Sequence, residues 1–244
     1  MKLLRVQSIS KNFGGIKALD SCTLNAEKEK ITAIIGPNGS GKTTLFNVIF
    51  SLVKEDKGEI YLGEENITKK EDYEIAKKGI SRTFQEVRLF KNLTIRDHLE
   101  IALDNDDEML LKSFIKGGHN NEGKIKEILE LVGLNKNIDT YATDLSYGQR
   151  KLLDLAVSIA KPHELLMLDE PVAGINPKLR EEIKEILKKL RKKGETILLI
   201  EHDMDFVMNL ADYVFVLDEG KVIAEGKAEK IQKNKKVLEA YLGE

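Results

Sequence analysis

The sequence contains a single cysteine, Cys22, among its 244 residues. One cysteine excludes an intrachain disulfide, and a chain without disulfides is typical of a reducing cytoplasm. Long apolar runs are also missing, because no stretch approaches the length that spans a bilayer and residues 1–5 do not resemble a signal peptide. We therefore expect any work at a membrane to be done from its surface, through a partner.

An excess of charge of either sign is missing too. The 39 Lys and Arg residues nearly balance 41 Asp and Glu residues, for a net charge of −2. This balance lacks the basic footprint of a nucleic-acid binder, so no nucleic-acid partner is expected. Hydrophobic and charged contents of 41% and 33% are typical of a globular protein, and the length suits one large domain or two small ones.

Residues 36–43 match the phosphate-binding pattern G-x-x-x-x-G-K-[ST], between a predicted buried strand at 31–35 and a predicted helix at 44–50. We call this phosphate-binding loop the cradle. In such a loop, backbone N–H groups and the dipole of the following helix attract phosphates. Lys42 would bind the β- and γ-phosphates, and Thr43 would ligate Mg²⁺. An ordinary glycine-rich turn is the alternative, but it rarely matches the full pattern. The candidate nucleotide-binding residues here are Gly36, Pro37, Asn38, Gly39, Ser40, Gly41, Lys42, Thr43 and Thr44.

The pattern of apolar residues outlines the remaining elements. Residues 3–35 predict short antiparallel strands that lead into the cradle, and residues 58–63 predict another strand. From Thr94 to about Gly133 the spacing is helical, interrupted by polar stretches at 104–108 and 117–121 that predict solvated loops.

An α/β core is predicted in the last third of the chain. Residues 165–168 and 196–200 are continuous apolar runs, typical of parallel strands buried on both faces. The helix between them has Asn176 as its predicted N-cap and Pro177 in its first turn. A hairpin over 213–217 and 222–224, and a final helix ending at residue 242, follow it.

Two carboxylates follow the strand at 165–168. Asp169 comes directly after these four apolar residues, at the end of the predicted strand, and Glu170 is the next residue. In P-loop nucleotide sites an acidic residue at this position holds Mg²⁺, so we expect Asp169 to do so through water and Glu170 to polarise the attacking water. Four apolar residues before Asp-Glu are weak evidence alone, but together with the cradle they indicate the second half of a nucleotide site.

The stretch Leu145-Ser146-Tyr147-Gly148-Gln149 begins a helix. Ser146 and Gln149 have capping-box spacing, which leaves the helix N-terminus able to face an anion. An ordinary capped helix is the alternative. The stretch resembles the LSGGQ signature of ATP-binding cassette (ABC) ATPases, with Tyr147 in place of the first glycine. The resemblance implies that residues 146–149 face the γ-phosphate held by the other subunit of a head-to-tail dimer.

The resemblance to ABC ATPases covers almost the whole chain. It implies that Phe13 stacks on adenine, that Gln85 is the Q-loop glutamine and contacts Mg²⁺, and that His202 is the switch histidine. The ordinary alternatives are a core aromatic residue, a surface polar residue and a buried histidine. The implied catalytic residues are Lys42, Gln85, Glu170 and His202.

An ABC ATPase is an α/β P-loop NTPase, and the resemblance implies this fold for the chain. The expected single domain, 1–244, comprises a RecA-like parallel-sheet core with an antiparallel β subdomain, formed by 1–93 and 151–244. An α-helical subdomain that carries the signature is expected at 94–150.

Arg82-Thr83-Phe84-Gln85, residues 87–94 and the ending 239–243 most resemble the LivG-type ATPases of branched-chain amino-acid importers. The resemblance implies hydrolysis of ATP with Mg²⁺ at the cytoplasmic face of the membrane, as a peripheral subunit. The implied partners are LivH/LivM-like permease subunits and either a LivF-like second ATPase or a second copy of this chain. A binding protein on the far side would take part only indirectly.

Asn176 also departs from the wider ABC pattern, because it stands where the D-loop usually has aspartate. In the LivG-type proteins Tyr147 is a subfamily trait, and its side chain is expected to point away from phosphate.

Other functions remain as alternatives. The ATPases of urea importers and lipopolysaccharide exporters have similar endings. A soluble, non-transport ABC ATPase would need long coiled coils or tandem cassettes, which the sequence lacks. A GTPase would need an N-K-x-D motif, and the segment that begins at Asn135 has Ile138 in its fourth position.

Overall fold

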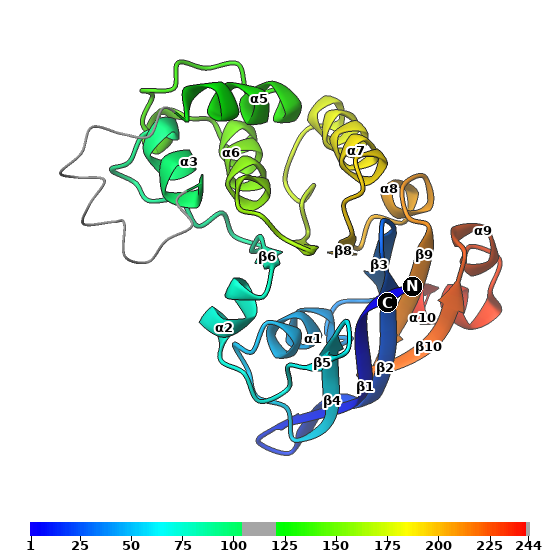
Figure 1. Cartoon of the computed structure of the whole chain (residues 1–244). Coiled ribbons are helices and arrows are strands. Elements are labelled where there is room, and N and C mark those ends of the chain that lie inside the picture. Colours follow the sequence, from blue (N-terminus) through cyan, green and yellow to red (C-terminus); the bar gives the residue numbers. More distant parts are fainter. Residues whose placement is uncertain (104–120, 243–244) are drawn as a thin grey trace. The chain divides into compact units, whose positions relative to one another are not determined.

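The computed structural model describes residues 1–103 and 121–242, so the predicted polar loops at 104–108 and 117–120 lie outside the described residues. Contacts within the chain define two compact units (Figure 1). The first comprises residues 1–80, 164–170 and 187–244, and the second comprises 81–163 and 171–186.

An antiparallel sheet forms the beginning of the first unit. Its strands are β1 (Lys2–Phe13), β2 (Ile16–Glu27), β4 (Lys57–Leu62) and β5 (Glu65–Asn66), in the order β2-β1-β4-β5. The strand predicted at 58–63 is confirmed as β4. The short strands predicted before residue 27 are instead two strands of 12 residues each. Several register shifts along the β1–β2 pair break the apolar alternation, which is why the pattern looks like shorter strands.

The central sheet of the first unit is mainly parallel. Within this unit its order is β10-β9-β3-β8-β7. β3 pairs in parallel with β8 and β9, and β8 with β7, whereas β10 returns antiparallel on β9. The predicted buried strands and the closing hairpin are thus confirmed. The bounds are β3 (Ile31–Ile35), β7 (Leu165–Asp169), β8 (Ile197–Ile200), β9 (Tyr213–Asp218) and β10 (Lys221–Gly226).

One hydrophobic core fixes helix α1 (Lys42–Ile49) within the first unit. Leu45 and Phe46 on α1 are fully buried, in the same cluster as Leu4 of β1 and Met167 and Phe215 of the central sheet. Because α1 is packed against both sheets, the start of this helix and the loop before it are held firmly.

The other helices of the first unit are short. They are α2 (Asp72–Lys77), α8 (Met204–Met208), α9 (Ala228–Ile231) and α10 (Lys235–Leu242), the last of which confirms the predicted final helix. Strand β6 (Ile80–Arg82) lies where the first unit gives way to the second.

Three helices pack together in the second unit: α3 (Ile95–Leu103), α5 (Glu122–Val132) and α6 (Tyr147–Ala160). Figure 1 shows them grouped in green. Buried residues such as Leu99, Leu129 and Leu153 lie in their interior. Gly133 ends α5 in the left-handed conformation, with φ of 69°, where the helical spacing of the sequence also stops. A short 3₁₀ turn, η1 (Ala142–Asp144), precedes α6, and α7 (Pro177–Lys192) runs from the second unit into the first.

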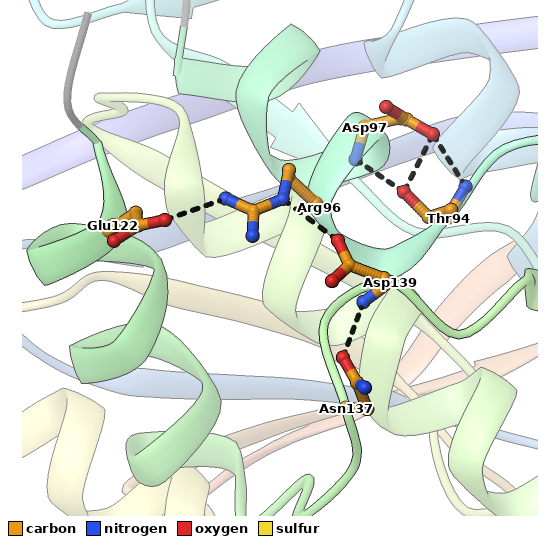
Figure 2. A network of polar contacts seen from close by, with 6 residues as sticks. All are labelled: Thr94, Arg96, Asp97, Glu122, Asn137 and Asp139. Atoms are coloured by element: carbon orange, nitrogen blue, oxygen red, sulfur yellow. Dashed lines mark hydrogen bonds and ion pairs between the residues drawn. The ribbon is translucent and has the colours of Figure 1, made fainter.

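Arg96 joins the parts of the second unit that precede and follow residues 104–120. Its Nε donates to Oδ1 of Asp139 at 3.0 Å, and its Nη1 donates to Oε1 of Glu122 at 3.1 Å (Figure 2). These bonds link α3 to the start of α5 and to the loop before η1. Asn137 Oδ1 accepts the N–H of Asp139 at 3.0 Å, a local turn contact.

Thr94 and Asp97 form the N-terminal cap of α3. The N–H and hydroxyl of Thr94 both donate to Oδ2 of Asp97, at 2.8 and 2.6 Å, and the N–H of Asp97 donates to Thr94 Oγ1 at 3.1 Å (Figure 2). Such reciprocal capping fixes where α3 begins. Among the helices of the described residues, none combines the length and the apolar character needed to cross a bilayer.

Candidate functional site

The loop at residues 36–43 depends on two glycines that lie against neighbouring backbone. Gly36 has φ of +153°, and a Cβ there would come within 2.0 Å of the Leu217 carbonyl oxygen. Gly41 has φ of +99°, and its Cβ would lie 2.4 Å from the Ala18 carbonyl oxygen. Any other residue at either position would push the loop away from β9 or β2.

A second turn supports the loop from behind. The N–H of Gly220, in the turn between β9 and β10, donates to the Ser40 carbonyl at 3.0 Å. The Gly220 carbonyl in turn accepts the N–H of Asp20 at 2.9 Å. These hydrogen bonds were not predicted from the sequence, in which the glycine of the closing hairpin was the only sign of them.

Lys42 is held over the loop. Its side chain is buried, and Nζ donates to the carbonyls of Gly36 and Pro37, both at 2.8 Å. The first turn of α1 has no acidic side chain, so the positive end of the helix dipole is unopposed there. Thr43, the next residue, is exposed at the start of the same helix. The arrangement places an ammonium, a hydroxyl and a helix N-terminus at one position, as a phosphate-binding loop requires.

Phe13 lies at the end of β1, beside the turn that leads to β2. Its side chain is 46% exposed, and Nζ of Lys11 lies 5.5 Å from the ring centroid. Phe13 is therefore not a core residue, and the ring offers an accessible face for stacking.

Asp169 ends β7 and Glu170 follows it, both within the first unit. Asp169 is 1% exposed. Glu170 has φ of +48°, an uncommon backbone conformation for a residue with a side chain, and its N–H donates to the Ile200 carbonyl at 3.0 Å. Strained backbone of this kind is concentrated at functional sites.

The structure brings His202 to Glu170. Nδ1 of His202 lies 3.9 Å from Oε1 of Glu170, and the histidine side chain is 56% exposed. The alternative of a buried core histidine is therefore wrong. Glu201, between β8 and His202, was missed from the sequence: it is fully buried, and its Oε2 accepts the N–H of His202 at 3.3 Å. A carboxylate directly after a buried strand was its only signal.

The predicted capping box at the start of α6 is confirmed. Ser146 Oγ accepts the N–H of Gln149 at 3.3 Å, and Gln149 Oε1 accepts the N–H of Ser146 at 3.0 Å. Gly148 sits close to α7, since a Cβ there would lie 2.6 Å from a methyl carbon of Leu179. Ser146 is exposed. The helix start therefore presents a polar end to solvent in the second unit.

Tyr147 faces the loop at 173–176. Its hydroxyl donates to the Ala173 carbonyl at 3.4 Å, and a Cβ on Gly174 would lie 3.3 Å from its ring. A glycine at position 147, as in the wider ABC signature, could not make these contacts. These contacts could not be predicted from local sequence, because the partners are far apart along the chain.

Asn176 caps helix α7. Its Oδ1 accepts the N–H of Leu179 at 2.9 Å, which confirms the predicted N-cap. Asparagine and aspartate cap helices about equally well, so the departure from the usual D-loop residue preserves this local function.

Gln85 belongs to the second unit, whereas Lys42, Asp169, Glu170 and His202 belong to the first. Its side chain is exposed and its carbonyl accepts Nζ of Lys151 at 3.1 Å. The predicted approach of Gln85 to a metal ion and to water remains a prediction.

The candidate metal ligands of the first unit are the hydroxyl of Thr43 and the carboxylate of Asp169. Both supply hard oxygen atoms, which Mg²⁺ prefers. Among the residues that the structure describes, no group of three or more His, Cys, Asp or Glu side chains could hold a metal ion by itself.

Comparison with known proteins gives two matching family models. The model described as "ABC transporter" matches residues 19–173. The model described as "Branched-chain amino acid ATP-binding cassette transporter" matches residues 221–244. A similar curated protein is "Probable branched-chain amino acid transport ATP-binding protein LivG" of Archaeoglobus fulgidus. It is 41% identical over 247 residues, which cover 100% of this chain and 96% of that protein.

Solved structures also resemble the chain. An ATP-binding cassette of an ABC transporter in its ADP conformation has a TM-score of 0.86 and 37% identity, and the match covers 100% of both chains. A dimeric ATP-binding cassette in a post-hydrolysis state, bound to ADP and Pi, has a TM-score of 0.79 and 27% identity, with 92% of this chain and 98% of that chain covered.

Proposed function

Because this chain belongs to the ABC transporter family, we propose that it is the ATP-hydrolysing subunit of an importer of branched-chain amino acids. The observation that carries the proposal is the phosphate-binding loop with Lys42 at its centre, in the same unit as the Glu170–His202 pair. The match at residues 221–244 and the full-length similarity to a LivG protein support the choice of cargo.

ATP binds with its adenine on the ring of Phe13 and its phosphates in the loop at 36–44. Lys42 already has its ammonium over this loop, bound to neutral carbonyls. Phosphate oxygens are negatively charged and form stronger hydrogen bonds with the ammonium than neutral carbonyls do, so they replace those carbonyls. Thr43, Gln85 and, through water, Asp169 are the residues that would hold Mg²⁺, which when bound would neutralise part of the phosphate charge.

Hydrolysis depends on positioning and charge stabilisation more than on covalent chemistry. Glu170 polarises the attacking water. Its left-handed backbone conformation fixes the point from which its side chain extends. His202, 3.9 Å from Glu170, stabilises charge that develops in the transition state. The resemblance to ABC ATPases assigns Gln85 the link between hydrolysis and the membrane partner.

The start of α6 serves the ATP of another subunit. Ser146 and the N–H of Gly148, with Gln149 completing the cap, contact its γ-phosphate in a head-to-tail dimer. Tyr147 points away from that phosphate, consistent with its bond to the Ala173 carbonyl. The solved neighbour that is a dimer with ADP and Pi supports this arrangement. The second subunit is a LivF-like ATPase or another copy of this chain.

The whole chain acts as one ABC ATPase domain, 1–244, with a nucleotide-binding core and β subdomain at 1–93 and 151–244 and a helical subdomain at 94–150. It works at the cytoplasmic face of the membrane, bound to LivH/LivM-like permease subunits. An extracytoplasmic binding protein affects it only through the permease, and no nucleic acid takes part.

The test is ATP hydrolysis by the complete transporter in lipid vesicles, assembled from this chain, its natural permease subunits and the binding protein. Leucine, isoleucine or valine should stimulate hydrolysis several-fold, and urea should not. A complex with Lys42→Ala is the matched control and should be inactive with every cargo. Stimulation by urea alone would overturn the cargo, and absence of hydrolysis under all conditions would overturn the ATPase assignment.

A further inference from the structure

Lys151 is a buried cation on helix α6, in the turn after the signature residues. Its side chain is only 5% exposed. Lysine normally extends its ammonium into water, because a buried charge costs several kcal/mol unless hydrogen bonds or opposite charges compensate it. The contacts of this ammonium therefore show what holds it in the interior.

The ammonium reaches a segment far away along the chain. Nζ of Lys151 donates to the backbone carbonyl of Gln85 at 3.1 Å. Nζ also lies 6.0 Å from the ring centroid of Tyr147, whose hydroxyl bonds the loop at 173–176. All these residues lie in the second unit. Lys151 thus contacts the segment of Gln85 directly and the loop at 173–176 through Tyr147.

The segment around Gln85 is itself organised around an aromatic ring. The guanidinium carbons of Arg82 and Arg88 lie 4.9 and 3.9 Å from the ring centroid of Phe84. With the neighbouring residue fixed in this way and the Gln85 carbonyl bound to Lys151, the glutamine side chain is left exposed. The backbone is anchored while the functional group remains available.

We propose that Lys151 is a positioning residue that fixes the backbone of Gln85 to the first turns of α6, so that Gln85 and the signature residues Ser146 and Gly148 move as one body. The role of these residues in ATP hydrolysis rests on the proposed function. The physical link between the two segments does not, since it rests on contacts within the second unit.

The test is backbone hydrogen exchange in the purified full-length chain, combined with steady-state ATP hydrolysis by the assembled transporter. Lys151→Met keeps the length of the side chain and removes the hydrogen bond. It should speed exchange at residues 83–88 by about tenfold, the effect of losing one hydrogen bond to a charged group. Exchange in α5 should not change. The kcat for ATP should fall more than its KM rises.

Two further variants separate positioning from general stability. Lys151→Arg retains the charge and the donors, so it should restore most of the exchange protection and of kcat. Lys126→Met on α5 removes a lysine whose side chain is 79% exposed and should change neither. Unchanged exchange at 83–88 in Lys151→Met, or exchange that rises equally through α3 and α5, would overturn the proposal. If the wild-type transporter hydrolyses no ATP, the proposed function fails, but the exchange result in the chain alone still decides the role of Lys151.

Discussion

At the scale of single residues, burial determines the behaviour of two groups outside the nucleotide site. Burial raises the pKa of the Asp154 carboxyl to about 7, against the opposing effect of the Lys151 ammonium. Burial likewise raises the pKa of the Cys22 thiol to about 12. Each group therefore reports on the folding of the element that buries it.

Replacing Asp154 by asparagine should change how stability depends on pH. Between about pH 4 and pH 7 the folded chain keeps a proton that the unfolded chain has released, so the stability of the wild type falls as the pH rises. Asp154→Asn has no such proton. Its free energy of unfolding relative to the wild type should increase by about 2 kcal/mol from pH 5 to pH 8, at about 1.4 kcal/mol per pKa unit with allowance for partial exposure. Urea unfolding of both proteins at the two pH values measures this, and parallel profiles would contradict it.

The thiol of Cys22 should not react while the chain is folded. It is 1% exposed on β2, and with its pKa near 12 almost none of it is thiolate at pH 8. We expect a thiol reagent to modify it only as fast as the antiparallel sheet opens. Urea-unfolded chain, in which labelling should be rapid, is the control. Rapid labelling of the folded chain would show that β2 is not packed as described.

At the scale of elements, the N-cap of α7 connects the D-loop position to helix stability. Asn176→Ala removes the acceptor for the Leu179 N–H and should lower the free energy of unfolding by about 1 kcal/mol. Asn176→Asp keeps the acceptor and adds a negative charge at the helix N-terminus, so it should be at least as stable as the wild type. Urea midpoints compare the three proteins. The capping role is wrong if the alanine variant matches the wild type.

Elements with local signals were predicted well from the sequence. The caps of α6 and α7, the Gly133 end of α5 and the buried strands β3, β7 and β8 depend on residues within a few positions of one another. The lengths of β1 and β2 were underestimated, because the register shifts that interrupt their pattern are properties of the paired strands.

The residues of the site show the same contrast between features with a local sequence signal and features that depend on distant contacts. The phosphate loop was identified from a sequence pattern, Glu170 from its place after a predicted buried strand, and His202 from the resemblance to ABC ATPases. The Lys151 contact with Gln85 and the Tyr147 contact with Ala173 were missed because they join residues distant in sequence. Lysine and tyrosine on an amphipathic helix ordinarily predict only a solvated face, so local sequence had no means to identify them.

At the scale of the whole molecule, the predicted ABC-ATPase fold and family are confirmed by the family model and by solved cassettes of similar structure. The first unit contains the phosphate loop, Asp169, Glu170 and His202, and the second contains Gln85 and the signature helix. In the proposed function, the chain therefore carries one ATP-binding surface and one signature surface, which a second subunit completes.

The most direct test of this account is ATP binding and ATP turnover by Glu170→Gln in the assembled transporter. The substitution preserves size and hydrogen bonding but removes the carboxylate that polarises water. We predict that ATP affinity stays within about twofold of the wild type while turnover falls by at least about a hundredfold, as expected for loss of a general base. Turnover at the wild-type rate would contradict the assignment of Glu170 and with it the proposed mechanism.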